Sequence, residues 1–246
     1  MAQLQSALEH YRRQRRIATL GLIGARREHQ RGNLKRALAL VTFAQLQAAQ
    51  DAVTASQDML DEQGVRAPAI AAVDAAALAG VASDGRDLLG LLQAVSRPEA
   101  PAGSFDRAVL TQISDAGRAG GAVSIAARPK VTGYVRMLVP PSCSRCAILA
   151  GKEYRWNQGF QRHPHCDCRH IPATERTARH LTTDPRAYFD SLDAAQQERI
   201  FTKAGAQAIR DGEEAWRRVV ITATQAAGLS GYPVPLSTAH APQVLT

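Results

Sequence analysis

Apolar residues recur at helical spacing through most of the first half of the chain. One series begins at Leu4, and a longer one runs from Leu34 to Leu60 and ends near Gly64. Residues three and four positions apart lie on one face of a helix, so each series predicts an amphipathic helix. A shorter helix is expected at residues 87–95.

Glycine and alanine modify this helical pattern at two places. Gly21 and Gly24 lower the helix propensity of the turns that follow the first series. Residues 69–80 are rich in alanine and follow Pro68, a residue that suits the first turn of a helix. We therefore predict a helix over residues 69–80.

The pattern changes after a stretch that is typical of a linker. Residues 96–104, SRPEAPAGS, contain two prolines and a glycine. Residues 131–139, VTGYVRMLV, are apolar and β-branched and predict a strand, and residues 169–172 predict a short one. A helix capped by Ser191 and extending to Gly212 should follow, and then another helix over residues 213–227.

These elements predict a mainly α-helical chain with a small α+β C-terminal domain. Residues 1–100 should form a basic helical N-terminal region, and a helix should begin after Ser104. Residues 104–228 should form the α+β domain, in which a metal-clipped strand and loop segment precedes C-terminal helices. Residues 229–246 contain three prolines and should form an irregular tail.

Positive charge is concentrated at the N-terminus. The formal net charge of the chain is +8, and residues 1–36 hold nine basic side chains against two acidic ones, a surplus of +7. A solvated helix face would explain these charges, but so few acids leave few partners one helical turn away. We therefore predict contact with a polyanion or an acidic protein surface. The candidate residues are Arg12, Arg13, Arg15, Arg16, Arg26, Arg27, Arg31, Lys35 and Arg36.

The apolar stretches are too short for export or for a membrane span. Residues 17–25, IATLGLIGA, follow an arginine cluster but lack a convincing cleavage site. No stretch approaches the roughly 20 apolar residues that a spanning helix needs. We expect a soluble protein made in a cytoplasm, where clustered cysteines bind metal more often than they form disulfides.

All four cysteines lie in one segment, as a C-x2-C pair, nineteen residues, and a C-x-C pair. Zinc prefers four thiolate or imidazole ligands in a tetrahedron, and two such pairs can supply them. His163 makes a Cys3His set equally possible, and His165 is a weaker candidate. We predict a structural zinc ion with the ligands Cys143, Cys146, Cys166 and Cys168, and with His163 as an alternative ligand.

Other interpretations of the cysteines fit less well. Metal-free buried cysteines would not be expected among Pro, Ser, Arg, Asp and His. A redox C-x2-C pair would open a helix after a strand, and the second cysteine pair argues against that chemistry. A catalytic zinc needs an open position and a nearby base, but the closest acid is Glu153, and HxE and HExxH motifs do not occur.

The cysteine segment resembles a known motif. CSRCAILAGKEY followed by HPHCDCRHIP is similar to the C-terminal motif of the phage Mu F-like head-morphogenesis proteins, which are minor capsid proteins of tailed phages. Residues 184–212 also resemble the downstream part of such proteins in actinobacterial phages and prophages, so the resemblance covers about residues 130–215. The family pattern maps onto Cys143, Cys146, Gly151, His163, Pro164, Cys166 and Cys168.

The resemblance implies a structural minor capsid protein of the virion, assembled in the host cytoplasm. Its partners would be the phage portal and capsid proteins, with packaged DNA bound through the basic N-terminus. It would act in head assembly, DNA packaging or ejection. The alternatives are a capsid maturation protease or another metal-dependent head enzyme, and a host zinc-containing DNA-binding module. Neither Ser142 nor Cys143 has a defined base partner, so we expect no enzyme activity.

Overall fold

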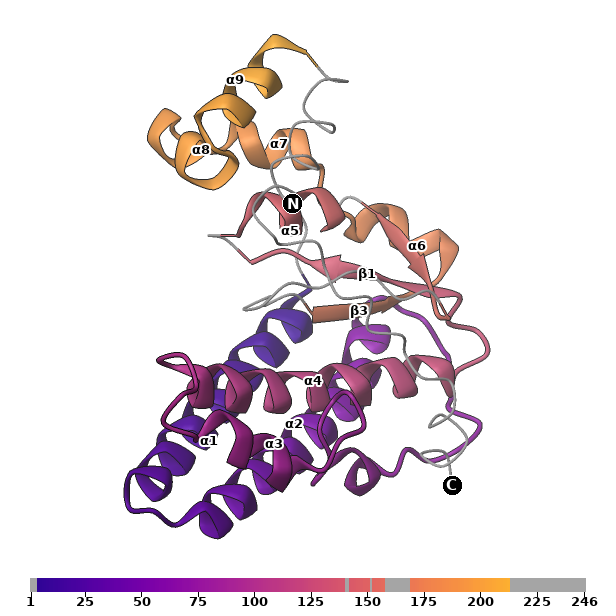
Figure 1. The fold of residues 1–246 in the computed structure, drawn as a ribbon. Coiled ribbons are helices and arrows are strands. Elements are labelled where there is room, and N and C mark those ends of the chain that lie inside the picture. The colour runs from indigo at the N-terminus through magenta and orange to yellow at the C-terminus, as the bar shows by residue number, and fades with distance from the viewer. Residues whose placement is uncertain (1–3, 140–141, 151, 158–168, 213–246) are drawn as a thin grey trace. The chain divides into compact units, whose positions relative to one another are not determined.

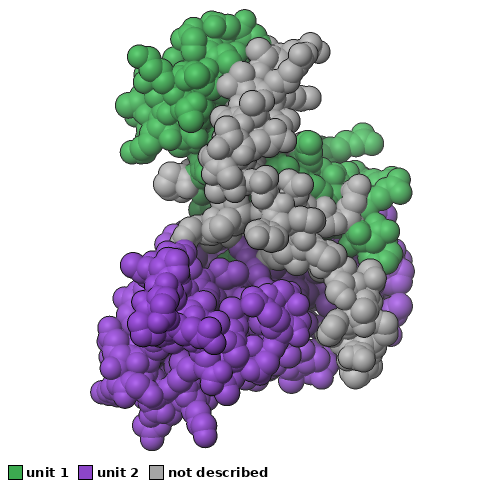
Figure 2. Space-filling view, in the orientation of Figure 1, with its two compact units in different colours: residues 1–2, 133–234 green, residues 3–132, 235–246 purple. Residues whose placement is uncertain are grey.

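The computed structural model describes residues 4–139, 142–150, 152–157 and 169–212 (Figure 1). Long helices come first, a three-stranded antiparallel sheet follows, and shorter helices come last, so the expected mainly helical class is confirmed. The described residues divide into two compact units, which we name in chain order: the first unit, 4–132, is purple in Figure 2, and the second unit, 133–212, is green. Within the described ranges, no helix combines the length and the apolar character needed to cross a membrane.

The first unit is built on an antiparallel pair of helices, α1 (Gln5–Gln30) and α2 (Leu34–Glu62). The α2 bounds confirm the series that was predicted to end near Gly64. The start of α1 is held by the end of α2, because the Glu62 carboxylate accepts hydrogen bonds from the backbone of Gln5 (2.8 Å) and Ser6 (2.9 Å). These bonds satisfy N–H groups that a helix start leaves without an intrahelical partner.

The glycines of α1 do not interrupt the helix. A Cβ atom at Gly21 would lie 2.7 Å from Ile113 Cδ1 and 2.8 Å from Ala44 Cβ, and one at Gly24 would lie 3.2 Å from Leu40 Cδ1. Gly21 therefore allows the close approach of neighbouring helices, whereas a Cβ atom at Gly24 would require the Leu40 side chain to shift by a few tenths of an ångström. Packing against these neighbours outweighs the low helix propensity of glycine.

A third long helix, α4 (Ser104–Ala126), packs on both α1 and α2, and the short helix α3 (Leu88–Val95) packs on α2 and α4. Because α4 buries its apolar face in this core, the boundary between the units falls at residues 132–133 and not in the expected linker at 96–104. The core is rich in alanine and includes Ala25, Ala37, Val41, Ala44, Ala48, Leu88, Leu92, Phe105, Val109 and Ile113.

The helix predicted over residues 69–80 is wrong, because only the 3-10 helix η1 (Ala75–Leu78) forms there. Side chains and backbone elsewhere in the unit take the hydrogen bonds that a longer helix would use. The backbone N–H of Gly80 donates to Gln45 Oε1 (2.9 Å), and Gln45 Nε2 donates to the Val81 carbonyl (2.8 Å). The Ile70 N–H donates to the Ala127 carbonyl (2.9 Å), so tertiary bonds override alanine propensity here.

The second unit contains the sheet, with strands β1 (Gly133–Met137), β2 (Glu153–Arg155) and β3 (Arg169–Ala173). Both outer strands pair antiparallel with β1, in the order β2-β1-β3. Helix α5 (Ser144–Ala150) lies between β1 and β2 in the chain. The strands predicted at 131–139 and 169–172 are confirmed.

Short helices complete this unit: α6 (Glu175–Leu181), α7 (Pro185–Asp190), α8 (Ala194–Phe201) and α9 (Lys203–Asp211). The helix predicted to run from Ser191 to Gly212 is divided, because Thr202 has a φ of 66° and starts a new helix by capping Gly205. The N-cap of α8 is Asp193 and not Ser191. The helix predicted at 213–227 and the tail at 229–246 lie outside the described residues.

Candidate metal centre

The C-x2-C pair opens helix α5. The Cys146 N–H donates to Cys143 Sγ over 3.4 Å, and the Ala147 N–H donates to the Cys143 carbonyl over 3.0 Å. Cys143 therefore occupies the N-terminal cap of the helix, with its side chain exposed, while Cys146 is buried one turn further on. A sulfur that accepts the N–H three residues on brings both cysteines to the same short turn, as a zinc knuckle requires.

A buried arginine lies beside the second cysteine. Arg136 of β1 is fully buried, and its Nη2 atom lies 3.9 Å from Cys146 Sγ. A guanidinium stabilises negative charge on a neighbouring sulfur, and the thiolate is the form in which cysteine binds metal. Cys146 also belongs to the apolar core of this unit, with Ala147, Phe189 and Phe201.

The pairing of β1 with β3 determines where the two cysteine pairs leave the sheet. Met137 at the end of β1 is directly opposite Arg169 at the start of β3, and Arg136 is opposite His170. In the sequence, Cys143 follows β1 by six residues and Cys168 immediately precedes β3. Both cysteine pairs are therefore attached to the same end of the sheet.

The remaining candidate ligands, His163, Cys166 and Cys168, lie outside the described residues, as do Gly151, Pro164 and His165. Among residues 4–139, 142–150, 152–157 and 169–212, no three His, Cys, Asp or Glu side chains gather as a metal site would require. A metal bound by Cys143 and Cys146 therefore needs further ligands from outside the described residues, and residues 158–168 are the candidate source. The sequence supplies sulfur and imidazole donors in that segment, and these match the preference of zinc.

Tyr188 of α7 positions the turn that precedes the cysteines. Its hydroxyl accepts from the Ser142 N–H (3.1 Å) and donates to the Ser142 carbonyl (3.2 Å), while Ser142 Oγ donates to the Val139 carbonyl (2.6 Å). Tyr188 is buried, so these bonds form in an environment with little competing water. The residue before Cys143 is thus fixed by a helix more than forty positions away in the sequence.

Aromatic side chains share the sheet face on which α5 packs. Residues directly opposite each other on antiparallel strands project from the same face. Tyr134 of β1 stacks on Tyr154 of β2 with centroids 5.3 Å apart and lies 4.4 Å from the His170 ring of β3. The Tyr154 hydroxyl donates to the Leu149 carbonyl of α5 (3.2 Å), so this cluster holds the C-terminal end of the helix that carries Cys146.

Sequence reasoning identified the cysteines but missed Arg136, Tyr134, Tyr154 and Tyr188. Arg136 stands in an apolar strand, and a charged residue there is a signal that could have singled it out. Tyr188 lies within the stretch that carries the family resemblance, but its contact with Ser142 depends on the tertiary fold.

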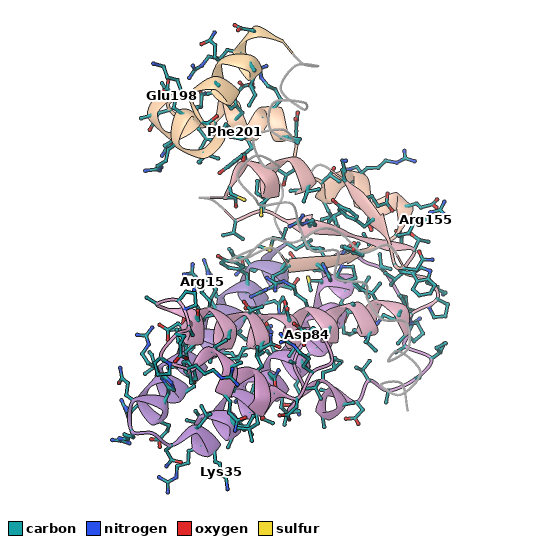
Figure 3. All side chains as sticks on the ribbon, in the orientation of Figure 1. Arg15, Lys35, Asp84, Arg155, Glu198 and Phe201 are labelled. Atoms are coloured by element: carbon teal, nitrogen blue, oxygen red, sulfur yellow. The ribbon has the colours of Figure 1, made fainter. Side chains whose placement is uncertain are left out.

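The nine basic residues of the N-terminal segment are all exposed. Three pair with acids: Arg13 with Asp51 of α2, Arg26 with Asp106 of α4, and Arg31 with Glu28 (2.9 Å). Lys35 extends away from the bundle where α2 begins, and Arg15 lies on the surface of α1 (Figure 3). The Arg15 guanidinium lies 5.9 Å from the centre of the Tyr11 ring.

The pair between α1 and α2 has a buried centre at Asp51. Burial raises the pKa of this carboxyl, but hydrogen bonds from His10 (2.7 Å), Gln14 (2.9 Å) and Arg13 outweigh burial and hold the pKa below its ordinary value. Asp51 is therefore ionised at neutral pH, and its carboxylate is bound by His10, Arg13 and Gln14 of α1. It does not reduce the charge of the other arginines in the segment.

The chain belongs to the VG15 protein family, whose model matches residues 1–195. The match includes the whole helical bundle as well as the sheet and all four cysteines. No curated protein and no solved structure matches the chain. The match therefore spans both the basic bundle and the cysteine segment.

Proposed function

We propose that the chain is a structural minor component of a tailed-phage head, of the Mu F-like kind, in which a zinc ion clips the cysteine segment. The motif from Cys143 to Cys168 supports the phage assignment through its resemblance to head-morphogenesis proteins. The match to the VG15 protein family covers both this motif and the basic bundle. The component would be associated with the portal and assembled in the host cytoplasm.

One observation carries the metal proposal: the antiparallel register of β1 and β3 attaches both cysteine pairs to the same end of the sheet. Cys168 is covalently joined to Arg169, so its Cα atom lies about 3.8 Å from that of Arg169. Only five residues separate Met137 from Cys143, so both pairs can reach one ion. Cys143 and Cys146 would supply two thiolates, and Cys166 and Cys168 or His163 would supply the others.

The proposed role of zinc is to hold the fold. A bound zinc ion supplies four short bonds that cross-link its ligands, which contributes directly to folding free energy. Cys146 is part of the unit's core and its sulfur lies beside Arg136, so the positive guanidinium would offset the negative charge of several thiolates. A ligand buried in the core of its unit suits a structural metal more than a catalytic one, which must keep a position open.

The exposed basic residues of α1 and the start of α2 are the proposed contact surface for packaged DNA or for an acidic surface of the portal. Arg12, Arg16, Arg27, Lys35 and Arg36 form no ion pair within the described part of the chain. Uncompensated charge attracts polyanions over distances of about one Debye length, roughly 8 Å at physiological salt.

Particle composition tests the structural role. We expect mass spectrometry of heads purified from a producing lysogen to find this chain at low copy relative to the major capsid protein. In the genome of that lysogen, portal and scaffold genes should lie beside the gene for this chain. Crosslinking in the same heads should join it to the portal. Absence of the chain from purified heads would contradict the proposal.

Elemental analysis of the purified full-length chain tests the metal. We expect about one equivalent of zinc, held tightly enough to survive dialysis and released by a strong chelator. A chelator that removes zinc without loss of fold, but abolishes proteolysis of the major capsid protein, would instead favour the head-enzyme alternative. A fully folded chain without metal would contradict both.

A further inference from the structure

Four of the large hydrophobic side chains that the described residues expose lie on the α1–α2 pair. They are Leu20 (58% exposed), Ile23 (49%), Leu40 (38%) and Phe43 (57%). Exposed large apolar side chains are ordinary when scattered singly, but a group of them on one surface marks an interaction site. We call these four residues the apolar strip.

The spacing of the strip places it on one continuous surface. On α1, Arg12, Arg16, Leu20, Ile23 and Arg27 follow one another at intervals of four, four, three and four residues, and all are exposed. Such intervals keep residues on one face of a helix.

On α2, the residues Arg36, Leu40 and Phe43 repeat that spacing, and all three are exposed. The two faces adjoin because Gly24 of α1 lies against Leu40 of α2, where a Cβ atom would be 3.2 Å from Leu40 Cδ1. Because Gly24 has no Cβ atom, Leu40 packs close to α1, and the exposed faces of α1 and α2 lie next to each other.

Basic side chains flank the strip along both helices. Arg16 precedes Leu20 by one turn, Arg27 follows Ile23 by one turn, and Arg36 precedes Leu40 by one turn. The acids nearest to them along the bundle are engaged elsewhere, since Glu28 pairs with Arg31, Asp51 with Arg13, and Asp106 with Arg26. The surface is therefore apolar along its centre and positive at its ends.

We infer that this surface docks an acidic amphipathic helix of another protein. A helix that lies along an antiparallel pair can bury its own apolar face on Leu20, Ile23, Leu40 and Phe43. Glutamates or aspartates at the edges of that face would meet Arg16, Arg27 and Arg36. The inference rests on the proposed function for the role of the basic surface, and it deepens that role by specifying the chemistry of the partner.

Charge and apolar area together select this occupant. A DNA backbone would pair with the arginines but would leave four large hydrophobic side chains in contact with water or phosphate. A second copy of this chain would bring one basic face against another, and like charges oppose such an interface. A protein helix with acidic edges satisfies both features of the surface, and aromatic and arginine side chains are enriched at protein interfaces.

Fluorescence anisotropy with a defined probe tests the inference. The probe is a labelled synthetic amphipathic peptide of about 18 residues, or five helical turns, with one leucine face edged by glutamates. The comparison probes are a scrambled peptide of the same composition, a DNA duplex, and vesicles of phosphatidylglycerol. The proteins are the full-length chain, the double variant Leu20→Gln/Phe43→Gln, and the control Ile70→Gln, which changes an exposed residue outside α1 and α2.

We expect the full-length chain to bind the amphipathic peptide and to prefer it to the scrambled one. The double variant should bind at least about tenfold more weakly, while Ile70→Gln binds as the unchanged chain does. Circular dichroism should be the same for all three proteins, because the substituted side chains are exposed.

Equal peptide binding by the double variant and the unchanged chain would overturn the inference. So would preference for the DNA duplex over the peptide, or vesicle binding that the double variant loses while peptide binding stays absent. None of these results would remove the chain from purified heads or change its zinc content. Failure of the docking inference is therefore distinguishable from failure of the proposed function.

Discussion

The two units of the molecule reach stability by different means. In the bundle, α1, α2 and α4 are each more than twenty residues long, and alanines and glycines let them pack closely over their whole length. In the second unit, no described helix exceeds nine residues and no described strand exceeds five. Short helices are marginal in isolation, so the second unit depends more on individual side-chain anchors and, in our proposal, on the zinc cross-link.

The comparison predicts its largest effect at an exposed cysteine. Cys143 is exposed, so without a metal its replacement by serine should change stability by less than about 0.5 kcal/mol. If Cys143 binds zinc, Cys143→Ser should cost several kcal/mol, on the order of 3–5, because a hydroxyl is a poorer zinc ligand than a thiolate. Hydrogen exchange on the full-length chain should show lost protection in α5, β1 and β3 while α2 and α4 keep theirs.

A second variant controls for packing at the same centre. Cys146→Ser should also lower the hydrogen-exchange protection of α5. Because it removes a core side chain as well as a proposed zinc ligand, this variant alone cannot separate packing from metal binding. If Cys143→Ser unfolds at the same temperature as the unchanged chain and retains one zinc, Cys143 is not a ligand.

The bundle should be destabilised by an added methyl group where its helices approach each other closely. A Cβ atom at Gly120 of α4 would lie 2.7 Å from the Ala49 carbonyl oxygen, which is backbone and cannot move aside cheaply. Gly120→Ala should therefore destabilise the bundle by about 1–3 kcal/mol, as overpacking does. Urea denaturation followed by helical circular dichroism measures the change.

Gly121→Ala is the matched control, since a Cβ atom there meets nothing within 4 Å. Alanine has the higher helix propensity by about 0.8–1 kcal/mol, so this neighbouring substitution should be neutral or stabilising. Equal destabilisation by both substitutions would show that close approach of α4 to α2 does not explain the glycine.

The smallest predicted effect is the pH dependence of the stability that Asp51 contributes to the bundle. The pKa of Asp51 is lowered in the folded bundle, so the ionised carboxylate contributes stability above its unfolded pKa, and this stability is lost as the pH falls through the folded pKa. Asp51→Asn should cost about 1–2 kcal/mol at neutral pH and less in acid, where the native carboxyl is protonated too.

Thermal unfolding between neutral pH and about pH 2 measures this dependence, followed through the exchange of amides in α1 and α2. Within the described part of the chain, Glu28 pairs with only one basic side chain, Arg31, which is exposed, and Glu28→Gln serves as the single-pair comparison. A variant Asp51→Asn that loses stability in acid as steeply as the unchanged chain would contradict the assignment to Asp51.

Long periodic patterns made the bundle's helices and the principal strand predictable from the sequence. The series from Leu34 to Leu60 satisfies one helical face over many turns, and residues 131–139 have few polar interruptions. By contrast, the alanines of residues 69–80 favour a helix locally, but Gln45 and Ala127 bind their backbone groups instead. The sequence contains no local sign of those partners.

The domain boundary and the residues that position the candidate site could not be predicted either, because both depend on tertiary contacts. Residues 96–104 have the composition of a linker, yet the helix that follows them packs into the bundle through Val109 and Ile113. The cysteine spacing indicated candidate ligands, which stay a prediction, because sulfur chemistry can be recognised without a fold. The roles of Arg136 and Tyr188 depend on strand register and on a helix far along the chain, which spacing does not reveal.

The pairing of Met137 with Arg169 also sets how freely the segment between them can vary in length. Within that stretch α5 and β2 are ordered elements, so an insertion after β2 lengthens only the connection from Arg155 to Arg169, whose two ends are already held by pairing of β2 and β3 with β1. The entropic cost of a longer flexible loop grows only logarithmically, by about 0.6 kcal/mol for each doubling. A peptide tag inserted at the turn of Trp156 and Asn157, where the Trp156 side chain is exposed, should therefore cost little folding free energy.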